Sequence, residues 1–256
     1  MFLIPKITEL FMDGVLNDLG WIRYTDKYAI EAGVANADYL EESSVGELKI
    51  FEEEGLLKEQ RQDKIGALFS SYGFTEGTVN INIGDVPEEL RKQYEDIVSS
   101  PFQSAIKKAS KQLKTSAEKA GVTGNKVIFA VNNGYSSLDA ENFERLFVSR
   151  CKRDSQSIGH AACVTIDYHQ GGFDAFIFCT PSVHKINSDE EWPFEAAFTE
   201  SVKNHFGRKM EMMLRDQMNP EFLKNRVEPV TSISFEREGI KYEYSSPSVP
   251  DSRFEK

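Results

Sequence analysis

The chain has 256 residues and a formal net charge of −11, with 40% hydrophobic and 28% charged residues. These proportions are ordinary for a globular protein, and no stretch approaches the roughly 20 consecutive apolar residues of a membrane span, so no membrane partner is expected. The acidic balance argues against a protein that coats nucleic acid, because such affinity comes from clustered Lys and Arg.

The first expected element is a helix over residues 5–19, because Pro5 suits a first helical position and apolar residues recur at three- and four-residue steps. The apolar stripe comprises Ile7, Leu10, Phe11, Val15 and Leu19. Glu9 and Asp13 lie four residues apart on another side of this helix. Residues 21–30 are aromatic and β-branched, which predicts a strand.

Two strands are expected next, on either side of a tight turn at Glu42 and Ser43. The antiparallel register that follows from this turn opposes Asp38 and Glu47 on one face of the hairpin. Lys49 points to the same face because side chains alternate along a strand. An alternative interpretation makes residues 47–58 a helix rich in Glu and Lys.

The remaining elements alternate between helices and strands, which predicts an α/β fold. Strands are expected at 78–83, 127–131, 161–168 and 173–179, the last two joined around 170–172, and a terminal hairpin at 232–235 and 240–244. Helices are expected at 87–99, 101–119, 136–150 and 193–218, with a frayed tail over 245–256. The continuous apolar run at 127–131 is typical of a strand that is buried on both faces.

Several further features limit the chemistry. The three cysteines are scattered without a C-x-x-C motif, which argues against disulfides and a structural zinc site. The first six residues lack the basic leader and apolar region of a signal peptide, so we expect a cytoplasmic protein. Lysines at 107–114 form a local basic run, which we interpret first as a solvated helix face and second as a basic groove.

Asp38, Glu47 and Lys49 suit metal-assisted cleavage of a phosphodiester. Mg²⁺ or Mn²⁺ prefers oxygen ligands, usually one or two carboxylates with waters and phosphate oxygens. Asp38 and Glu47 would supply the carboxylates, and the backbone carbonyl of Leu48 a further oxygen. Lys49 would hold the scissile phosphate or orient the attacking water.

The segment Ala37-Asp38-Tyr-Leu, followed by eight residues and then Glu47-Leu48-Lys49, resembles the signature of the PD-(D/E)xK nuclease superfamily. The resemblance implies a restriction-endonuclease-like fold, whose core is a mixed central sheet flanked by helices in the order α-β-β-β-α-β. It also implies metal-site or substrate roles for Glu9 on the first helix and for Gln112 or Lys108 on a later one. Ala37 stands where the signature has proline, and residues 52–100 form a long insertion.

We therefore expect a core over residues 1–185 with an insertion at about 52–100, and a C-terminal helix and hairpin over 186–256 that pack on the same domain. The expected function is a Mg²⁺- or Mn²⁺-dependent nuclease, with DNA favoured over RNA and a homodimer as a plausible assembly. The resemblance implies a setting in prokaryotic restriction, defence or repair. Two alternatives stay open. One is a non-catalytic nuclease-like subunit or nucleic-acid-binding module of a larger system, and the other is a soluble α/β interaction protein in which Asp38, Glu47 and Lys49 form a solvated cross-strand cluster of small energetic worth.

Overall fold

The computed structural model describes residues 4–29, 36–133, 137–171, 174–215, 226–227 and 232–245. A six-stranded mixed sheet lies at its centre, so the expected α/β class with a mixed sheet is correct. In sheet order the strands are β2 (Ile22–Arg23), β3 (Tyr39–Leu40), β4 (Val45–Phe51), β6 (Lys126–Asn132), β7 (His160–Gly171) and β8 (Asp174–Lys185). The three middle strands β4, β6 and β7 are parallel, and the outer pairings are antiparallel.

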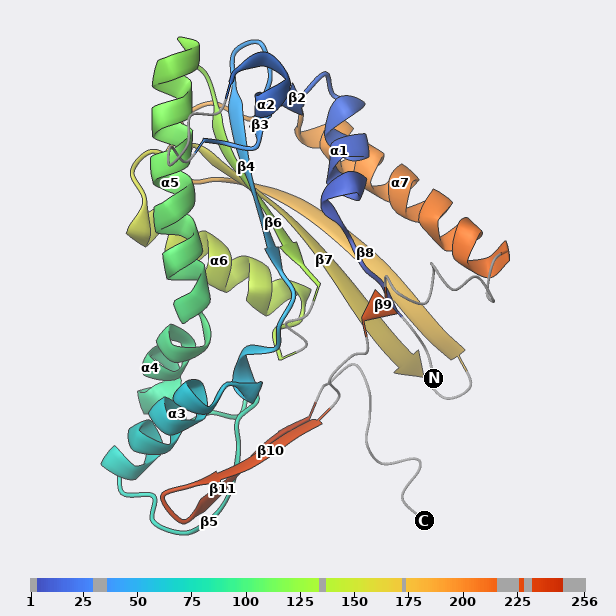
Figure 1. The fold of residues 1–256 in the computed structure, drawn as a ribbon. Helices are drawn as coiled ribbons and strands as arrows, with labels where there is room; N and C mark the ends of the chain where they lie inside the picture. Colours follow the sequence, from blue (N-terminus) through green and yellow to red (C-terminus); the bar gives the residue numbers. More distant parts are fainter. Residues whose placement is uncertain are drawn as a thin grey trace.

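Helices cover both faces of this sheet (Figure 1). Helices α5 (Ser100–Ala120) and α6 (Ala140–Asp154) pack on one face, and α1 (Glu9–Asn17) and α7 (Glu195–Arg215) lie on the other. Each face has its own cluster of buried apolar side chains. The predicted apolar run at 127–131 lies within β6, and all five of its residues are fully buried, as expected for a strand covered on both sides.

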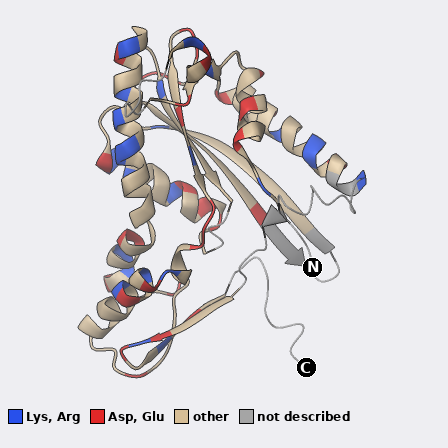
Figure 2. Ribbon diagram, in the orientation of Figure 1, with Lys and Arg blue, Asp and Glu red and all other residues tan. Residues whose placement is uncertain are grey.

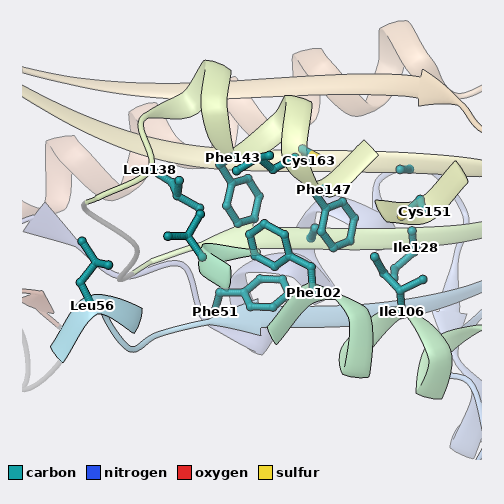
Figure 3. Close-up of a cluster of buried hydrophobic side chains, with 14 of the residues drawn as sticks. Phe51, Leu56, Phe102, Ile106, Ile128, Leu138, Phe143, Phe147, Cys151 and Cys163 are labelled. Carbon is teal, nitrogen blue, oxygen red and sulfur yellow. The ribbon is translucent and has the colours of Figure 1, made fainter. Parts of the chain in front are cut away.

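The two faces of β4 follow the alternation of its side chains. Leu48 points into the cluster beneath α1 and α7, whereas Val45 and Phe51 point into the cluster beneath α5 and α6. Figure 3 shows Phe51 among aromatic rings from both of the latter helices, and its ring centroid lies 5.0 Å from that of Phe102. Glu47 and Lys49 share the face of Val45 and Phe51, so they face α5.

The insertion folds together with the C-terminal hairpin. Strand β5 (Gly77–Asn80) pairs in parallel with β11 (Ile240–Ser245), which pairs with β10 (Ser232–Arg237). The turn of this predicted hairpin has positive φ angles at Glu238 (53°) and Gly239 (75°), as a type I′ turn requires. The other elements of this part are η1 (Gly55–Leu57), α3 (Glu59–Ser71) and α4 (Glu88–Val98).

The predicted start of the first helix is wrong. Residues Ile4–Pro5 form strand β1, which pairs with β9 (Arg226–Val227), and the helix begins only after Thr8, whose hydroxyl accepts a bond from the Phe11 N–H at 3.2 Å. Ile7 cannot join the helix because its N–H and carbonyl are both bonded to Asn133. Leu10, which we expected to be buried, is 79% exposed.

The predicted strand over residues 21–30 is also wrong in extent. Among the described residues 21–29 the only strand is β2, and α2 (Tyr24–Lys27) follows it at once. The buried Tyr24 explains the difference, since its N–H donates to the Asp38 carbonyl at 2.9 Å and its hydroxyl reaches the Ser116 carbonyl at 3.5 Å. The rival helix over 47–58 is excluded, because β4 occupies the first five of these positions.

The other predicted helices and strands are present with shifted ends, as their bounds above show. Some expectations fall outside the described residues: the turn at 172–173, the start of a helix at 136, the end of the long helix at 216–218 and the tail at 246–256. Within the described part of the chain, no helix is long and apolar enough to cross a membrane. The domain division at residue 185 stays a prediction.

Candidate functional site

Asp38 is fixed against β4 by two hydrogen bonds. Its N–H donates to the Gly46 carbonyl at 3.0 Å, and its Oδ2 accepts from the Leu48 N–H at 2.8 Å. The N–H and C=O of one residue in an extended strand point to the same side. The Leu48 carbonyl therefore points to the same edge of β4 as the Asp38 carboxylate. Strand β3 does not pair with this part of the edge.

The predicted hairpin register is confirmed at Tyr39–Gly46 and Leu40–Val45. Regular pairing does not extend to Asp38 and Glu47, because the Asp38 N–H bonds to Gly46 instead. The Asp38 carboxylate consequently reaches along the strand edge to Leu48 and does not sit squarely opposite Glu47.

Glu47 is a buried carboxylate, 1% exposed, on the face of β4 that points to α5. Its Oε1 contacts the Lys49 ammonium, whereas its Oε2 is buried without a hydrogen-bond partner among the described residues. Burial, and next the negative charge of Asp38, raise the pKa of Glu47 to about 7. An ionised Glu47 is therefore costly in the folded protein unless a further cation is present.

The environment of Asp38 acts in the same direction. Burial raises the pKa of Asp38, and the Leu48 N–H and the Lys49 and Arg23 charges oppose this effect only in part. Both carboxylates therefore have raised pKa values, and the charge of Asp38 contributes to the shift at Glu47.

Two lysines face this carboxylate pair. Lys49 contacts Glu47 directly and its side chain is 17% exposed. Lys108 on α5 lies close enough for its charge to lower the pKa of Glu47, without an ion-pair contact. The structure thus brings Asp38, Glu47, Lys49 and Lys108 together, as the sequence suggested.

Gln112 lies beside the site, and its side chain is hydrogen-bonded to the backbone that leads into Asp38. Its Nε2 donates to the Asn36 carbonyl at 2.7 Å, and one helical turn later the Ser116 hydroxyl accepts from the Ala37 N–H at 2.7 Å. Helix α5 therefore holds the two residues that lead into Asp38. A substrate contact by Gln112 stays a prediction.

Glu9 lies near Asp38 but is engaged elsewhere. Its charge raises the pKa of Asp38, yet its side chain is 71% exposed and its Oε2 lies 3.3 Å from Arg23. Arg23 also binds Asp13 at 2.6 Å and lies 4.6 Å above the centre of the Tyr39 ring. Glu9 therefore belongs to an ion-pair cluster beside the carboxylate pair, and a metal-ligand role for it stays a prediction.

Arg23, Asp13 and Ser116 were missed as parts of this region. The sequence places Asp13 four residues after Glu9 on the first helix without a role, and nothing in it distinguishes Ser116 from the other serines on α5. Each reaches the site through contacts between distant segments, which no local spacing reveals.

The donor set fits a hard divalent cation. The described residues contain no group of three or more His, Cys, Asp or Glu side chains placed to hold a metal. A Mg²⁺ site needs just one or two carboxylates, with waters and substrate phosphates completing the octahedron. Asp38, the unpartnered Oε2 of Glu47 and the Leu48 carbonyl meet that requirement.

Comparisons with known proteins gave no relative: no protein-family model, no curated protein and no solved structure matches the chain. Its function is therefore inferred from its own side chains.

Proposed function

We propose that the protein is a Mg²⁺- or Mn²⁺-dependent nuclease with a restriction-endonuclease-like core. The observation that carries this proposal is the buried pair Asp38 and Glu47, which has one unpartnered carboxylate oxygen and Lys49 in contact. Strongly shifted pKa values cluster at functional sites, and a buried carboxylate with a raised pKa lowers the stability of the fold, so a functional role would explain why the pair is present.

The order of the elements supports the proposal. Helix α1 is followed by β2, β3 and β4, then by α5 and β6, and apart from the one-turn α2 between β2 and β3 and the insertion before α5, this is the α-β-β-β-α-β order expected of such a core. The insertion between β4 and α5, which includes α3, β5 and α4, is an addition to that order. Membership of the PD-(D/E)xK superfamily is part of the proposal.

Each residue of the site has a proposed role. Asp38, Glu47 and the Leu48 carbonyl would hold the cation, with Glu9 as a candidate for an outer position. When bound, the cation would lower the pKa of a water and stabilise the negative charge that develops on the phosphate. Lys49 would hold a phosphate oxygen or orient the water, and Lys108 and Gln112 would face the substrate.

DNA is the proposed substrate ahead of RNA, and a homodimer, a cytoplasmic location and a role in restriction, defence or repair are proposed with it. The test is cleavage of plasmid, linear and single-stranded DNA by the purified protein in Mn²⁺ or Mg²⁺. We expect Asp38→Ala and Glu47→Gln to abolish both cleavage and metal binding, and Lys49→Met to abolish cleavage while metal still binds. Equal cleavage by the wild type and Asp38→Ala would refute the proposed nuclease function.

One observation favours a non-catalytic nuclease-like subunit instead. With a pKa of about 7, Glu47 is half protonated near neutrality, and its charged form already has a partner in Lys49. Absence of Mn²⁺ binding, or binding that Glu47→Gln leaves untouched, would select this alternative. The solvated cross-strand cluster is disfavoured, because Glu47 is buried.

A further inference from the structure

Helix α5 is strongly basic in an acidic protein. It carries five lysines and one glutamate, whereas the whole chain has a net charge of −11. All five lysines are exposed, and the four that lie within two helical turns are called the α5 lysine track here: Lys107, Lys108, Lys111 and Lys114. Figure 2 shows these basic positions spread along the helix at one side of the molecule.

The ion pairs found among the described residues leave most of the α5 lysine track without an acidic partner. Among the described residues, no carboxylate lies within ion-pair distance of Lys107, Lys111 or Lys114. The spacing places Lys107, Lys111 and Lys114 on one face, and Lys108 between that face and the buried side of the helix that includes Gln112. One end of the track therefore lies where Lys108 acts on Glu47.

The other end of the track lines a pocket of about 680 Å³ at the carboxyl end of α5. Lys111 and Lys114 form part of its wall, together with Lys126 at the start of β6, and one carboxylate, Glu118, also lines it. Bonds from the Gly121 and Val122 N–H groups cap the last carbonyls of the helix. The exposed end of the helix thus presents ammonium groups to the pocket while two of its terminal carbonyls are already bonded.

We propose that the α5 lysine track and this pocket bind the phosphate backbone of a nucleic-acid strand that extends from the site at Asp38 and Glu47. This inference rests on the proposed nuclease function, because a nucleic-acid substrate is assumed. Lysines are point charges that bind phosphates without reading bases, so the contact is independent of sequence. Each neutralised phosphate releases counterions, so binding should depend steeply on salt.

The test is the affinity for a short labelled DNA duplex, measured by fluorescence anisotropy in EDTA over a series of salt concentrations. We expect Lys111→Ala/Lys114→Ala to weaken binding at low salt about tenfold or more and to reduce the slope of log K against log salt by about 1.8, at roughly 0.9 per phosphate. Lys126→Ala should reduce the slope by about half as much. The control Lys64→Ala/Lys92→Ala removes the same charge from exposed positions on α3 and α4 and should leave the slope unchanged.

The inference is overturned if the α5 variant binds like the control, or if the wild type does not bind DNA or RNA of the same sequence at the lowest salt. Tighter binding of the RNA, with the same loss in the α5 variant, supports the track and makes RNA the substrate. The binding assay contains EDTA and so does not depend on cleavage. If the α5 lysines contribute to binding but the protein does not cut DNA in Mn²⁺ or Mg²⁺, only the proposed nuclease function is refuted. If cleavage depends on Asp38 but the α5 substitutions do not change DNA binding, only the proposed role of the α5 lysine track is refuted.

Discussion

The Asp38 Oδ2 accepts a hydrogen bond of 2.8 Å from the backbone N–H of Leu48, ten residues further along the chain. This bond ties the Asp38 carboxylate to the strand that carries Glu47 and Lys49. Helix α5 holds the other side of Asp38, through Gln112 to Asn36 and Ser116 to Ala37. The position of this carboxylate is therefore fixed from two separate elements, as a preorganised site requires.

Glu47→Gln should stabilise the protein in a manner that depends on pH. The pKa of Glu47 is about 7 in the folded protein and near 4.5 when unfolded, so the folded state holds more protons between these values. Wild-type stability therefore falls as pH rises through this window, by up to about 3 kcal/mol. Glu47→Gln does not lose stability in this way. Urea unfolding across the window should therefore show that the free energy of unfolding of the variant increasingly exceeds that of the wild type as the pH rises to 7.

Glu42→Gln is the matched control, because Glu42 is exposed at the turn of the same hairpin. Its stability relative to the wild type should not vary with pH. A difference between Glu47→Gln and the wild type that is constant across the window would show that Glu47 titrates normally.

Mn²⁺ affinity should rise with pH until Glu47 is ionised. A metal ligand must be deprotonated, so binding below the pKa of about 7 displaces a proton from Glu47. We expect the affinity to fall about tenfold for each pH unit below that value and to level off above it. Calorimetry in buffers of different ionisation enthalpy would count the released proton, and a dissociation constant that is flat across pH 7 would contradict a role for Glu47.

Ser116→Ala should destabilise the protein and loosen the site. The Ser116 hydroxyl is fully buried and accepts the Ala37 N–H at 2.7 Å, so its removal leaves a buried donor unsatisfied, at a cost of about 1–3 kcal/mol. Weaker Mn²⁺ binding should accompany the loss, because Asp38 follows Ala37 directly. The neighbouring Thr115→Ala should change stability by less than about 0.5 kcal/mol, and equal effects of the two would remove Ser116 from this role.

Gly46→Ala should strain the strand that carries Glu47. An added Cβ would lie 2.6 Å from Cε2 of Phe129 and 3.0 Å from Cζ3 of Trp21, both in buried rings. Overpacking of this kind costs about 1–3 kcal/mol. Thermal unfolding should show the loss, whereas Gly84→Ala, with open space around its Cβ, should unfold near the wild-type temperature. An unchanged unfolding temperature for Gly46→Ala would mean that the rings move aside freely.

The sequence predicted the hairpin well because its information is local. The turn at Glu42 and Ser43 fixes the register, and alternation then fixes the faces of Glu47 and Lys49. The end of regular pairing at Asp38 was not predictable, because it depends on bonds to Gly46 and Leu48 that replace the expected pair.

The errors lie where distant segments compete with local preference. Asn133 holds Ile7 out of the first helix, and packing of Tyr24 against α5 ends β2 early. Arg23 shows the same limit in the site, since its partners Glu9 and Asp13 lie on α1. Such contacts override helix and strand propensities, which are weak by comparison.

The central claim is that Asp38 and Glu47 form a metal-dependent nuclease site. Its most direct test is the rate at which the purified protein nicks supercoiled plasmid in Mn²⁺, compared with that of Asp38→Asn, which keeps the size of the side chain and removes its charge. We predict nicking by the wild type that EDTA abolishes, and none by Asp38→Asn although it remains folded. Equal rates for the two proteins, or a wild type that does not nick DNA in Mn²⁺, would contradict the account.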